Sequence, residues 1–347
     1  MSERQLRVVQ WATGNIGTRA LREVIRHPSL ELAGVFVFDA AKRGADAGML
    51  CGEGPVGVVA TDDRAAIRAL GADCILYMPR VFDIDDVVAL LESGSNIVTT
   101  RGELFGGGHR MGAENRARVV DACERGPASI YATGSSPGFI SETLPYALLS
   151  LQRHVECIEI DEFADMSRRD SPHMLFEQMG FGKPIDSFNP NRAAYLVGEF
   201  SPSLALLAEA AGRPVDAWAG TGEVAADRQP TALVAGDLPA GSVAAQRNTV
   251  VGTAGGAEVI RFSANWYCTT DVEPAWDLRP TGWRVRVRGD APFDVDLTFP
   301  VPVEDLGSVT PAYTANGPVN AIPYVCAARP GILSTIDLPV ITPAGPR

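Results

Sequence analysis

One carboxylate in this chain, that of Glu103, follows a short apolar run and lies in a loop made mostly of glycine and apolar residues (residues 99–108, TTRGELFGGG). A glutamate in such surroundings loses part of its hydration, which makes a carboxylate a stronger base. The sequence also allows a second interpretation, in which Glu103 caps the next helix or pairs with Arg101. We predict that Glu103 acts as a general base.

A glycine turn near the N-terminus is the second segment that could do chemistry. The apolar run 6–11 leads into ATGNIG, residues 12–17, and then into a helical pattern. Gly14 would let the backbone approach a pyrophosphate, and Gly17 would let the helix pack close to the strand. Ala12 stands where the usual fingerprint has its first glycine, so a turn that binds nothing is the alternative. The residues expected to contact a dinucleotide are Thr13, Gly14, Asn15, Ile16 and Gly17.

The next apolar run, residues 30–38, ends in Asp39, at about the distance expected for a residue that contacts the ribose. Asp39 would bind a ribose 2′-hydroxyl, as in NAD enzymes, whereas Lys42 and Arg43 would bind a 2′-phosphate, as in NADP enzymes. We favour NADP because two cations outweigh one carboxylate that can rotate away, and NAD stays open. A solvated loop is the alternative interpretation.

Residues that follow the later strands are further candidate contacts, because ligands of an open parallel sheet lie outside the carboxyl ends of its strands. The last such loop, residues 132–139 (ATGSSPGF), is built from small residues that can lie flat against a nicotinamide ring. Its alternative role is that of a simple interdomain turn. The contacts expected from these strand ends are Met78, Pro79, Thr100, Arg101, Ser135, Ser136 and Pro137.

An alternation of strand and helix patterns positions these segments. Strands are expected at 74–78, 96–100 and 129–133, and helices at 62–70, 84–92 and 113–125. Such alternation indicates an α/β fold with a doubly wound parallel sheet, which we assign to residues 1–150.

Residues 151–310 have a different texture and are expected to form a second, α+β domain. Its strand patterns at 155–163, 248–266 and 283–299 alternate between apolar and polar residues, which predicts a largely antiparallel sheet. A helix is expected at 204–211, after a Met/Phe-rich segment at 174–181. A C-terminal helix within 311–330 is expected to return to the first domain.

Composition narrows the class of protein. The 347 residues are 46% hydrophobic and 21% charged, with a formal net charge of −12 and no basic run, which argues against nucleic acid as a partner. The six cysteines form no C-x-x-C pair, so we expect the protein to lie in a reducing cytoplasm. The four histidines have no metal-ligand spacing, so we expect no bound metal. His109, close to Glu103 in sequence, is the one histidine of interest. No apolar stretch reaches bilayer length, and no apolar signal core follows the first residues, so neither a membrane nor export is expected.

Five short motifs, taken in their order along the chain, resemble one family. They are WATGNIG (11–17), GADAG (44–48), TTRGEL (99–104), TGSSPGF (133–139) and VNAIP (319–323). Over nearly its full length the chain resembles the dihydrodipicolinate reductase-like superfamily. Within it, the chain is most similar to the branch that contains 2,4-diaminopentanoate dehydrogenase and the native amine dehydrogenases.

The resemblance implies a Rossmann domain, a second domain that forms a homodimer and covers the substrate, and a C-terminal helix whose Asn320 approaches the nicotinamide carboxamide. It also implies reversible oxidative deamination of an amine, or reductive amination of a ketone or aldehyde with ammonia, with Glu103 as the base. An apolar substrate pocket is expected, with plain core packing as the alternative for each residue. The pocket candidates are Phe139, Met174, Phe176 and Trp266.

The sequence departs from the family's motifs at two places, and each limits the function that the resemblance implies. The His-His-x-x-Lys segment of true dihydrodipicolinate reductases is missing from residues 162–172, so a role in lysine biosynthesis is not expected. Amine dehydrogenases show two acidic residues before the leucine of the third motif, whereas this chain has Gly102 and Glu103, and we equate Glu103 with the second. An imine or carbonyl reductase is the alternative enzyme, and a nucleotide-binding sensor without turnover is the alternative outside enzymes.

Overall fold

The computed structural model describes residues 4–187 and 191–343, which fold into two compact units. Unit 1 runs to Phe139 and resumes at Thr310, and unit 2 comprises Ile140–Val309. The division falls before Ile140 and not after residue 150, because Ile140 is fully buried in the core of unit 2, against which Leu144 and Leu148 also pack.

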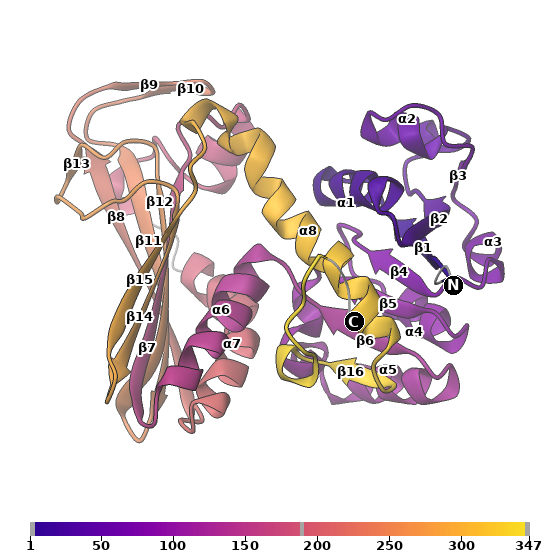
Figure 1. The fold of residues 1–347 in the computed structure, drawn as a ribbon. Coiled ribbons are helices and arrows are strands. Elements are labelled where there is room, and N and C mark those ends of the chain that lie inside the picture. Colours follow the sequence, from indigo (N-terminus) through magenta and orange to yellow (C-terminus); the bar gives the residue numbers. More distant parts are fainter. Residues whose placement is uncertain (1–3, 188–190, 344–347) are drawn as a thin grey trace. The chain divides into compact units, whose positions relative to one another are not determined.

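Unit 1 is built on a seven-stranded sheet in which every neighbouring pair is parallel (Figure 1). In spatial order the strands are β16 (Gly331–Leu333), β6 (Ser129–Ala132), β5 (Asn96–Thr99), β4 (Cys74–Tyr77), β1 (Leu6–Trp11), β2 (Leu30–Phe36) and β3 (Ala60–Thr61). Because β2 and β4 lie on opposite sides of β1, the strand order reverses there, as in doubly wound sheets. The predicted Rossmann sheet is confirmed, and β16 extends it by a strand that the sequence did not indicate.

Helices cover both faces of this sheet. The side chains of α1 (Asn15–Arg26) and α8 (Leu306–Cys326) share one apolar cluster with β1, β4 and β5. On the opposite face lie α3 (Arg64–Ala69), α4 (Ile84–Glu92) and α5 (Ala113–Arg125), and α2 (Ala47–Cys51) packs beside α1. The Asp83 carboxylate accepts hydrogen bonds from the N–H groups of Asp85 and Asp86 and so caps α4, which spans the predicted residues 84–92.

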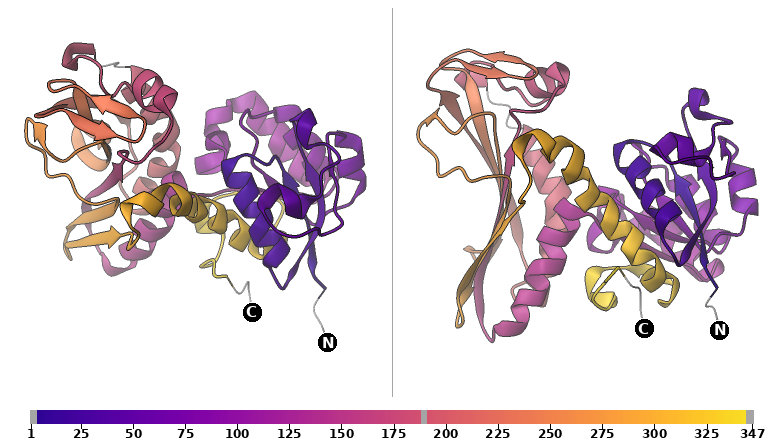
Figure 2. Two further views of the ribbon diagram at one scale, coloured as in Figure 1. Left: turned by 90° about the horizontal axis from the view of Figure 1, so that it is seen from above. Right: turned by 45° about the horizontal axis from the view of Figure 1, so that its top comes forward.

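Unit 2 contains a second seven-stranded sheet. Its order is β13 (Val272–Glu273), β8 (Ala217–Asp227), β11 (Val243–Ala254), β12 (Ala257–Tyr267), β7 (Val155–Asp165), β14 (Gly282–Gly289) and β15 (Phe293–Thr298). All neighbours are antiparallel except β7 and β12, which are parallel, so the expected largely antiparallel sheet is confirmed with one exception. The helices α6 (Leu144–Leu148) and α7 (Asn191–Ala210) lie on one face of it (Figures 1 and 2).

Shorter elements complete the two units. A hairpin joins β9 (Thr231–Leu233) to β10 (Gly236–Leu238). The 3-10 and π-helical segments are η1 (Ala40–Lys42), η2 (Gly102–Met111), η3 (Ser135–Thr143), η4 (Leu149–Leu151), η5 (His173–Gln178), η6 (Ile185–Ser187), η7 (Val303–Asp305) and η8 (Thr335–Asp337). Among the helices described, none is long and apolar enough to cross a membrane.

Candidate functional site

The glycine turn joins β1 to α1 as the sequence predicts. Ala12, at the place of the missing first glycine, has a φ of +76°, a conformation that favours glycine, so the backbone of the turn is kept although the residue is not. A Cβ on Gly17 would collide with the Ala12 carbonyl oxygen and lie 2.9 Å from Gln10 Nε2. Gly17 is therefore required for the close approach of α1 to β1.

The turn fits a dinucleotide phosphate by a separate observation. A Cβ added to Gly14 would meet no heavy atom within 4 Å, so the space in front of the first turn of α1 is open. Among the described residues, no side chain caps the helix at Gly14, which leaves the first N–H groups to a ligand.

The loop after β2 carries Asp39, Lys42 and Arg43, the three residues predicted to determine the choice of cofactor, and each of them makes different contacts. Lys42 Nζ donates hydrogen bonds to the Thr13 carbonyl oxygen at 2.8 Å and to its hydroxyl at 3.2 Å, so Lys42 lies against the glycine turn. Asp39 accepts a hydrogen bond from the Ala41 N–H and caps η1. Arg43 is exposed and pairs with Asp62 at 3.2 Å. Lys42 is thus the cation placed next to the proposed phosphate site.

Hydrogen bonds tie the carboxyl ends of β1, β4, β5 and β6 together at one edge of the sheet. Met78 donates its N–H to the Trp11 carbonyl oxygen, Thr99 Oγ1 bonds to the Tyr77 carbonyl oxygen at 2.6 Å, and the Thr133 N–H bonds to the Thr99 carbonyl oxygen. The predicted contacts Met78, Pro79, Thr100 and Arg101 directly follow these strands, and they therefore share an edge with the glycine turn.

Thr314 of α8 reaches the loop after β6. Thr314 Oγ1 lies 2.6 Å from Ser135 Oγ. Ser136 Oγ is buried and has no hydrogen-bond partner among the described residues, which suits a loop that receives a polar ligand group. The motif VNAIP drew attention to Asn320, whereas no pattern in the sequence distinguishes Thr314.

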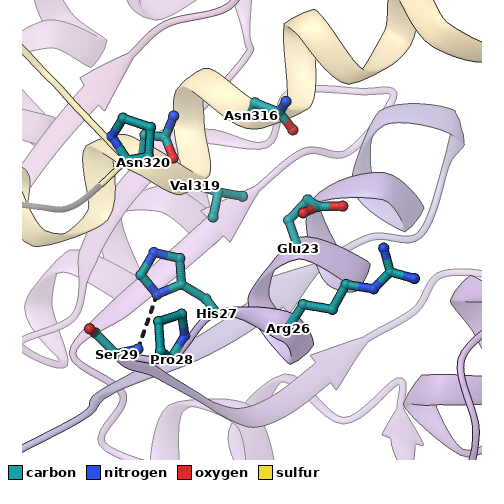
Figure 3. A pocket seen from close by; sticks show the side chains of 9 residues that line it. Glu23, Arg26, His27, Pro28, Ser29, Asn316, Val319 and Asn320 are labelled. Carbon is teal, nitrogen blue, oxygen red and sulfur yellow. Dashed lines mark hydrogen bonds between the residues drawn. The ribbon is translucent and has the colours of Figure 1, made fainter.

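Asn320 lines a different pocket, of about 460 Å³, at the C-terminal end of α1 (Figure 3). Its other lining residues include Glu23, Arg26, His27 and Asn316. Because the glycine turn lies at the opposite end of α1, this structure does not bring Asn320 together with the glycine turn. Its predicted approach to a nicotinamide stays a prediction.

Glu103 lies in η2, directly after β5, and is paired with Arg101. Arg101 Nη2 is 2.6 Å from Oε1 and Arg101 Nε is 3.1 Å from Oε2, a two-pronged ion pair in which each side chain is about a quarter exposed (26% and 25%). The pairing that the sequence left as an alternative is therefore present. Such a pair fixes the orientation of the carboxylate.

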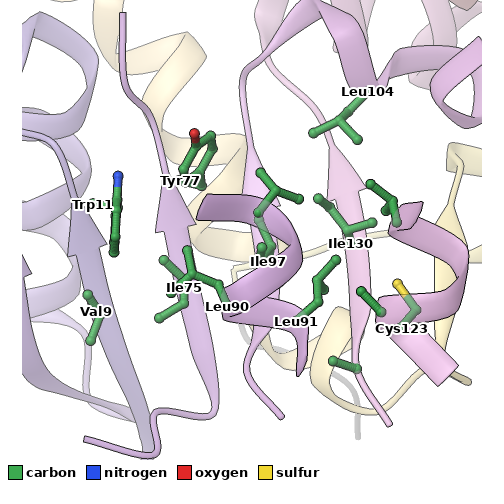
Figure 4. Packing of buried hydrophobic residues seen from close by; sticks show 14 of the residues in the cluster. Val9, Trp11, Ile75, Tyr77, Leu90, Leu91, Ile97, Leu104, Cys123 and Ile130 are labelled. Carbon is green, nitrogen blue, oxygen red and sulfur yellow. The ribbon is translucent and has the colours of Figure 1, made fainter. Parts of the chain in front are cut away.

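The residue after the carboxylate anchors the segment. Leu104 is 1% exposed and belongs to the same apolar cluster as Ile97 of β5 and Ile130 of β6 (Figure 4). Gly106, Gly107 and Gly108 then adopt positive φ angles, which turn the chain toward α5. His109 is exposed, and no contact with Glu103 is seen.

The predicted pocket residues divide between the units. Met174, Phe176 and Trp266 all pack against one apolar cluster of unit 2, whereas Phe139 ends unit 1 and is 38% exposed. The clustering of Met174, Phe176 and Trp266 is consistent with a shared apolar wall of a substrate pocket and equally with core packing.

Other reactive groups are of little use for catalysis. Burial raises the pKa of the Cys123 thiol to about 11, and Cys74 and Cys268 shift in the same direction for the same reason. Thiols of this kind are poor nucleophiles. Within the described residues, no three His, Cys, Asp or Glu side chains are arranged to hold a metal ion.

Comparison with solved structures shows which class of protein has this fold. The chain resembles an amine dehydrogenase from Mycobacterium smegmatis with a TM-score of 0.74 at 17% identity, covering 98% of both chains. It also resembles a probable dehydrogenase from Thermotoga maritima, with a TM-score of 0.56 at 11% identity, covering 96% of this chain and 92% of the other. The chain therefore shares its fold with these two proteins.

Comparison of sequences narrows this class to a family. Residues 139–344 match the model of the 2,4-diaminopentanoate dehydrogenase C-terminal domain. An amine dehydrogenase from Streptomyces virginiae is 28% identical over 346 residues, which is 96% of either protein. The chain belongs to the 2,4-diaminopentanoate dehydrogenase family, as the sequence motifs indicated, and is an oxidoreductase of the dehydrogenase type.

Proposed function

We propose that the protein is an amine dehydrogenase that uses NADP, or NAD, to deaminate an amine oxidatively and, in reverse, to aminate a ketone or aldehyde with ammonia. The observation that carries the proposal is the oriented carboxylate of Glu103 at the same sheet edge as the open turn at Gly14. The similarity to amine dehydrogenases supports it.

The cofactor would be held by unit 1. Residues 13–17 would bind its pyrophosphate at the N-terminus of α1, and Ser135, Ser136 and Pro137 would face its nicotinamide. Lys42 is the residue we propose for the 2′-phosphate of NADP, because it follows β2 and, unlike Arg43, which pairs with Asp62, forms no ion pair within the described residues. When bound, the nicotinamide ring accepts a hydride from the substrate carbon.

Glu103 would supply the proton transfer that this chemistry needs. Near neutral pH an amine is an ammonium ion without a lone pair, so a base must remove its proton before the neighbouring C–H bond can give up a hydride. An ionised carboxylate has about four acceptor positions, of which the Arg101 pair uses two, so Glu103 keeps capacity for a substrate N–H. In the reverse direction the same carboxylate would take a proton from ammonium and stabilise a cationic imine.

The substrate is expected to be a small amine or carbonyl compound with an apolar part. Met174, Phe176 and Trp266 of unit 2 are the side chains we propose for contact with that part, because they share one cluster. Apolar walls would exclude water, which strengthens the contact with the carboxylate and limits hydrolysis of the imine.

The dependence of carbonyl reduction on ammonium tests the proposal. Oxidation of NADPH would be followed with a panel of ketones and aldehydes, with and without ammonium chloride, and with potassium chloride at equal ionic strength as the control. An amine dehydrogenase consumes NADPH only with ammonium and yields the amine. Equal rates in both salts would instead identify a carbonyl reductase, and nucleotide binding without turnover on any compound would identify a sensor.

A further inference from the structure

A polar row crosses the sheet of unit 2 on the face that α7 covers. Its paired residues, from β8 to β15, are Gly222, Asn248, Ala264, Glu162, Trp283 and Leu297. Phe200 of α7 stacks on Phe262, two residues before Ala264 on β12 and therefore on the same face. The adjacent row contains Val250, Phe262 and Ile160, all fully buried. The polar row thus borders an apolar core.

Glu162 is held in this row by two indoles. Trp266 Nε1 donates to Oε1 and Trp283 Nε1 donates to Oε2, each at 3.2 Å. The two donors orient the carboxylate without neutralising it, because an indole N–H carries no formal charge. Two of the four acceptor positions of the carboxylate stay available.

Asn248 is the second polar member of the row and is fully buried. Neither its Oδ1 nor its Nδ2 has a hydrogen-bond partner among the described residues. Its neighbours in the row, Gly222 and Ala264, have no polar side-chain atoms, so they offer none. Buried amides are rarely left unpaired, and an unpaired one in the same row as a charged group points to a missing ligand group.

We propose that Glu162 and Asn248 bind the ammonium group of a small organic cation. The two residues lie two strands apart, roughly 10 Å between their backbones, with only the Ala264 methyl between them in the row. An ammonium group there donates N–H bonds to the Glu162 carboxylate and to Asn248 Oδ1. The indole rings beside Glu162 add an electrostatic attraction for a cation.

The site is suited to an organic ammonium ion more than to a metal ion. Inorganic cations such as Ca²⁺ need six or more oxygen ligands, whereas this row offers one carboxylate, one amide and aromatic rings. The inference rests on the proposed function in that an amine dehydrogenase takes ammonium compounds, and it deepens it by assigning to unit 2 a binding residue for such a group. Glu162 binds in this account and transfers no proton.

Binding measured without nucleotide tests this site apart from turnover. Alkylammonium chlorides of one to six carbons and the alcohols of equal length would be titrated into the full-length protein by ligand-observed NMR. We expect at least one ammonium ion to bind, and to bind at least tenfold more tightly than its matching alcohol. Glu162→Gln should weaken ammonium binding at least tenfold, whereas Glu156→Gln, an exposed glutamate on the same strand, should leave it unchanged.

Asn248→Leu separates ligand binding from a structural role. Leucine removes the unpaired amide, so the variant should keep its thermal midpoint while ammonium binding falls severalfold. Asn248→Ala serves the same purpose if leucine does not fit. No ammonium binding, equal affinity for alcohols, or unchanged binding in Glu162→Gln overturns the site. If ammonium binding follows these variants but no amine is oxidised, the site stands and the proposed function falls.

Discussion

The Lys42 ammonium group lies 2.8 Å from the carbonyl oxygen of Thr13, so a cation from the loop after β2 is bonded to the glycine turn itself. A phosphate bound at this turn would have that charge beside it.

Lys42→Ala is expected to raise the Kd for NADPH at least tenfold and the Kd for NADH much less, because only NADPH carries the 2′-phosphate. Fluorescence titration of the reduced cofactors measures both. Lys183→Ala, which removes the other lysine of the chain, is the matched control and should change neither. An equal rise of the Kd for both cofactors would show that Lys42 acts on the glycine turn, which both cofactors share, and not on the 2′-phosphate.

The two glycines of the turn should respond differently to alanine. Gly17→Ala forces a collision with the Ala12 carbonyl oxygen and should destabilise the fold by about 1–3 kcal/mol. Gly14→Ala meets nothing in the protein, so its stability should change by less than about 0.5 kcal/mol while cofactor affinity falls. Urea unfolding and cofactor titration of both variants test this, and unaltered cofactor binding in Gly14→Ala would contradict the phosphate site.

Leu104→Ala should destabilise unit 1 by about 2–5 kcal/mol, since it opens a cavity beneath the segment that carries Glu103. Chemical denaturation measures the loss. Leu151→Ala, at a side chain that is 66% exposed, should cost less than about 0.5 kcal/mol. A similar cost in both variants would mean that Leu104 does not anchor η2.

We propose a homodimer formed through the sheet face of unit 2 opposite α6 and α7. Thr249 of β11 lies centrally on this face, paired with Thr221 of β8 and Ser263 of β12. Thr249→Arg should convert the dimer to a monomer in sedimentation velocity, because a self-complementary interface brings the new charge against its copy. Ala194→Arg, exposed on α7, should leave the dimer intact. A dimer that survives Thr249→Arg would place the interface elsewhere.

Local signals made much of unit 1 predictable. The helix 84–92 was predicted to the residue because Asp83 caps its start, and the helix 113–125 because Gly126 follows its end. The seventh strand, β16, escaped prediction because three residues carry no periodicity and pair with a strand some 200 residues away.

The longest helices were underestimated for a different reason. Pro202 lies inside α7, and Pro311, Pro318 and Pro323 lie inside α8, where proline normally predicts a break. Only the C-terminal part of α7 was therefore predicted, and α8 begins before the predicted range 311–330. The parallel pairing of β7 with β12 depends on contacts far apart in sequence, which the alternation within a strand does not reveal.

The candidate site was predictable where a motif carries its chemistry and not where tertiary contacts create it. Gly14, Gly17 and Glu103 have local signatures. Thr314 is next to Ser135 only because α8 returns to unit 1, and Asn248 is an ordinary polar residue of a strand until its pairing partners are known.

Glu103→Gln tests the central claim most directly. The amide keeps the size of the side chain but cannot take up the ammonium proton, so NADP-dependent amine oxidation should fall at least a thousandfold while the Kd for NADPH stays within twofold. Glu114→Gln, at an exposed glutamate of α5, controls for the loss of one charge. Single-turnover formation of NADPH from a saturating amine is the measurement. Loss of hydride transfer in Glu103→Gln alone is the predicted result, and normal transfer in that variant would contradict the assignment of Glu103 as the base.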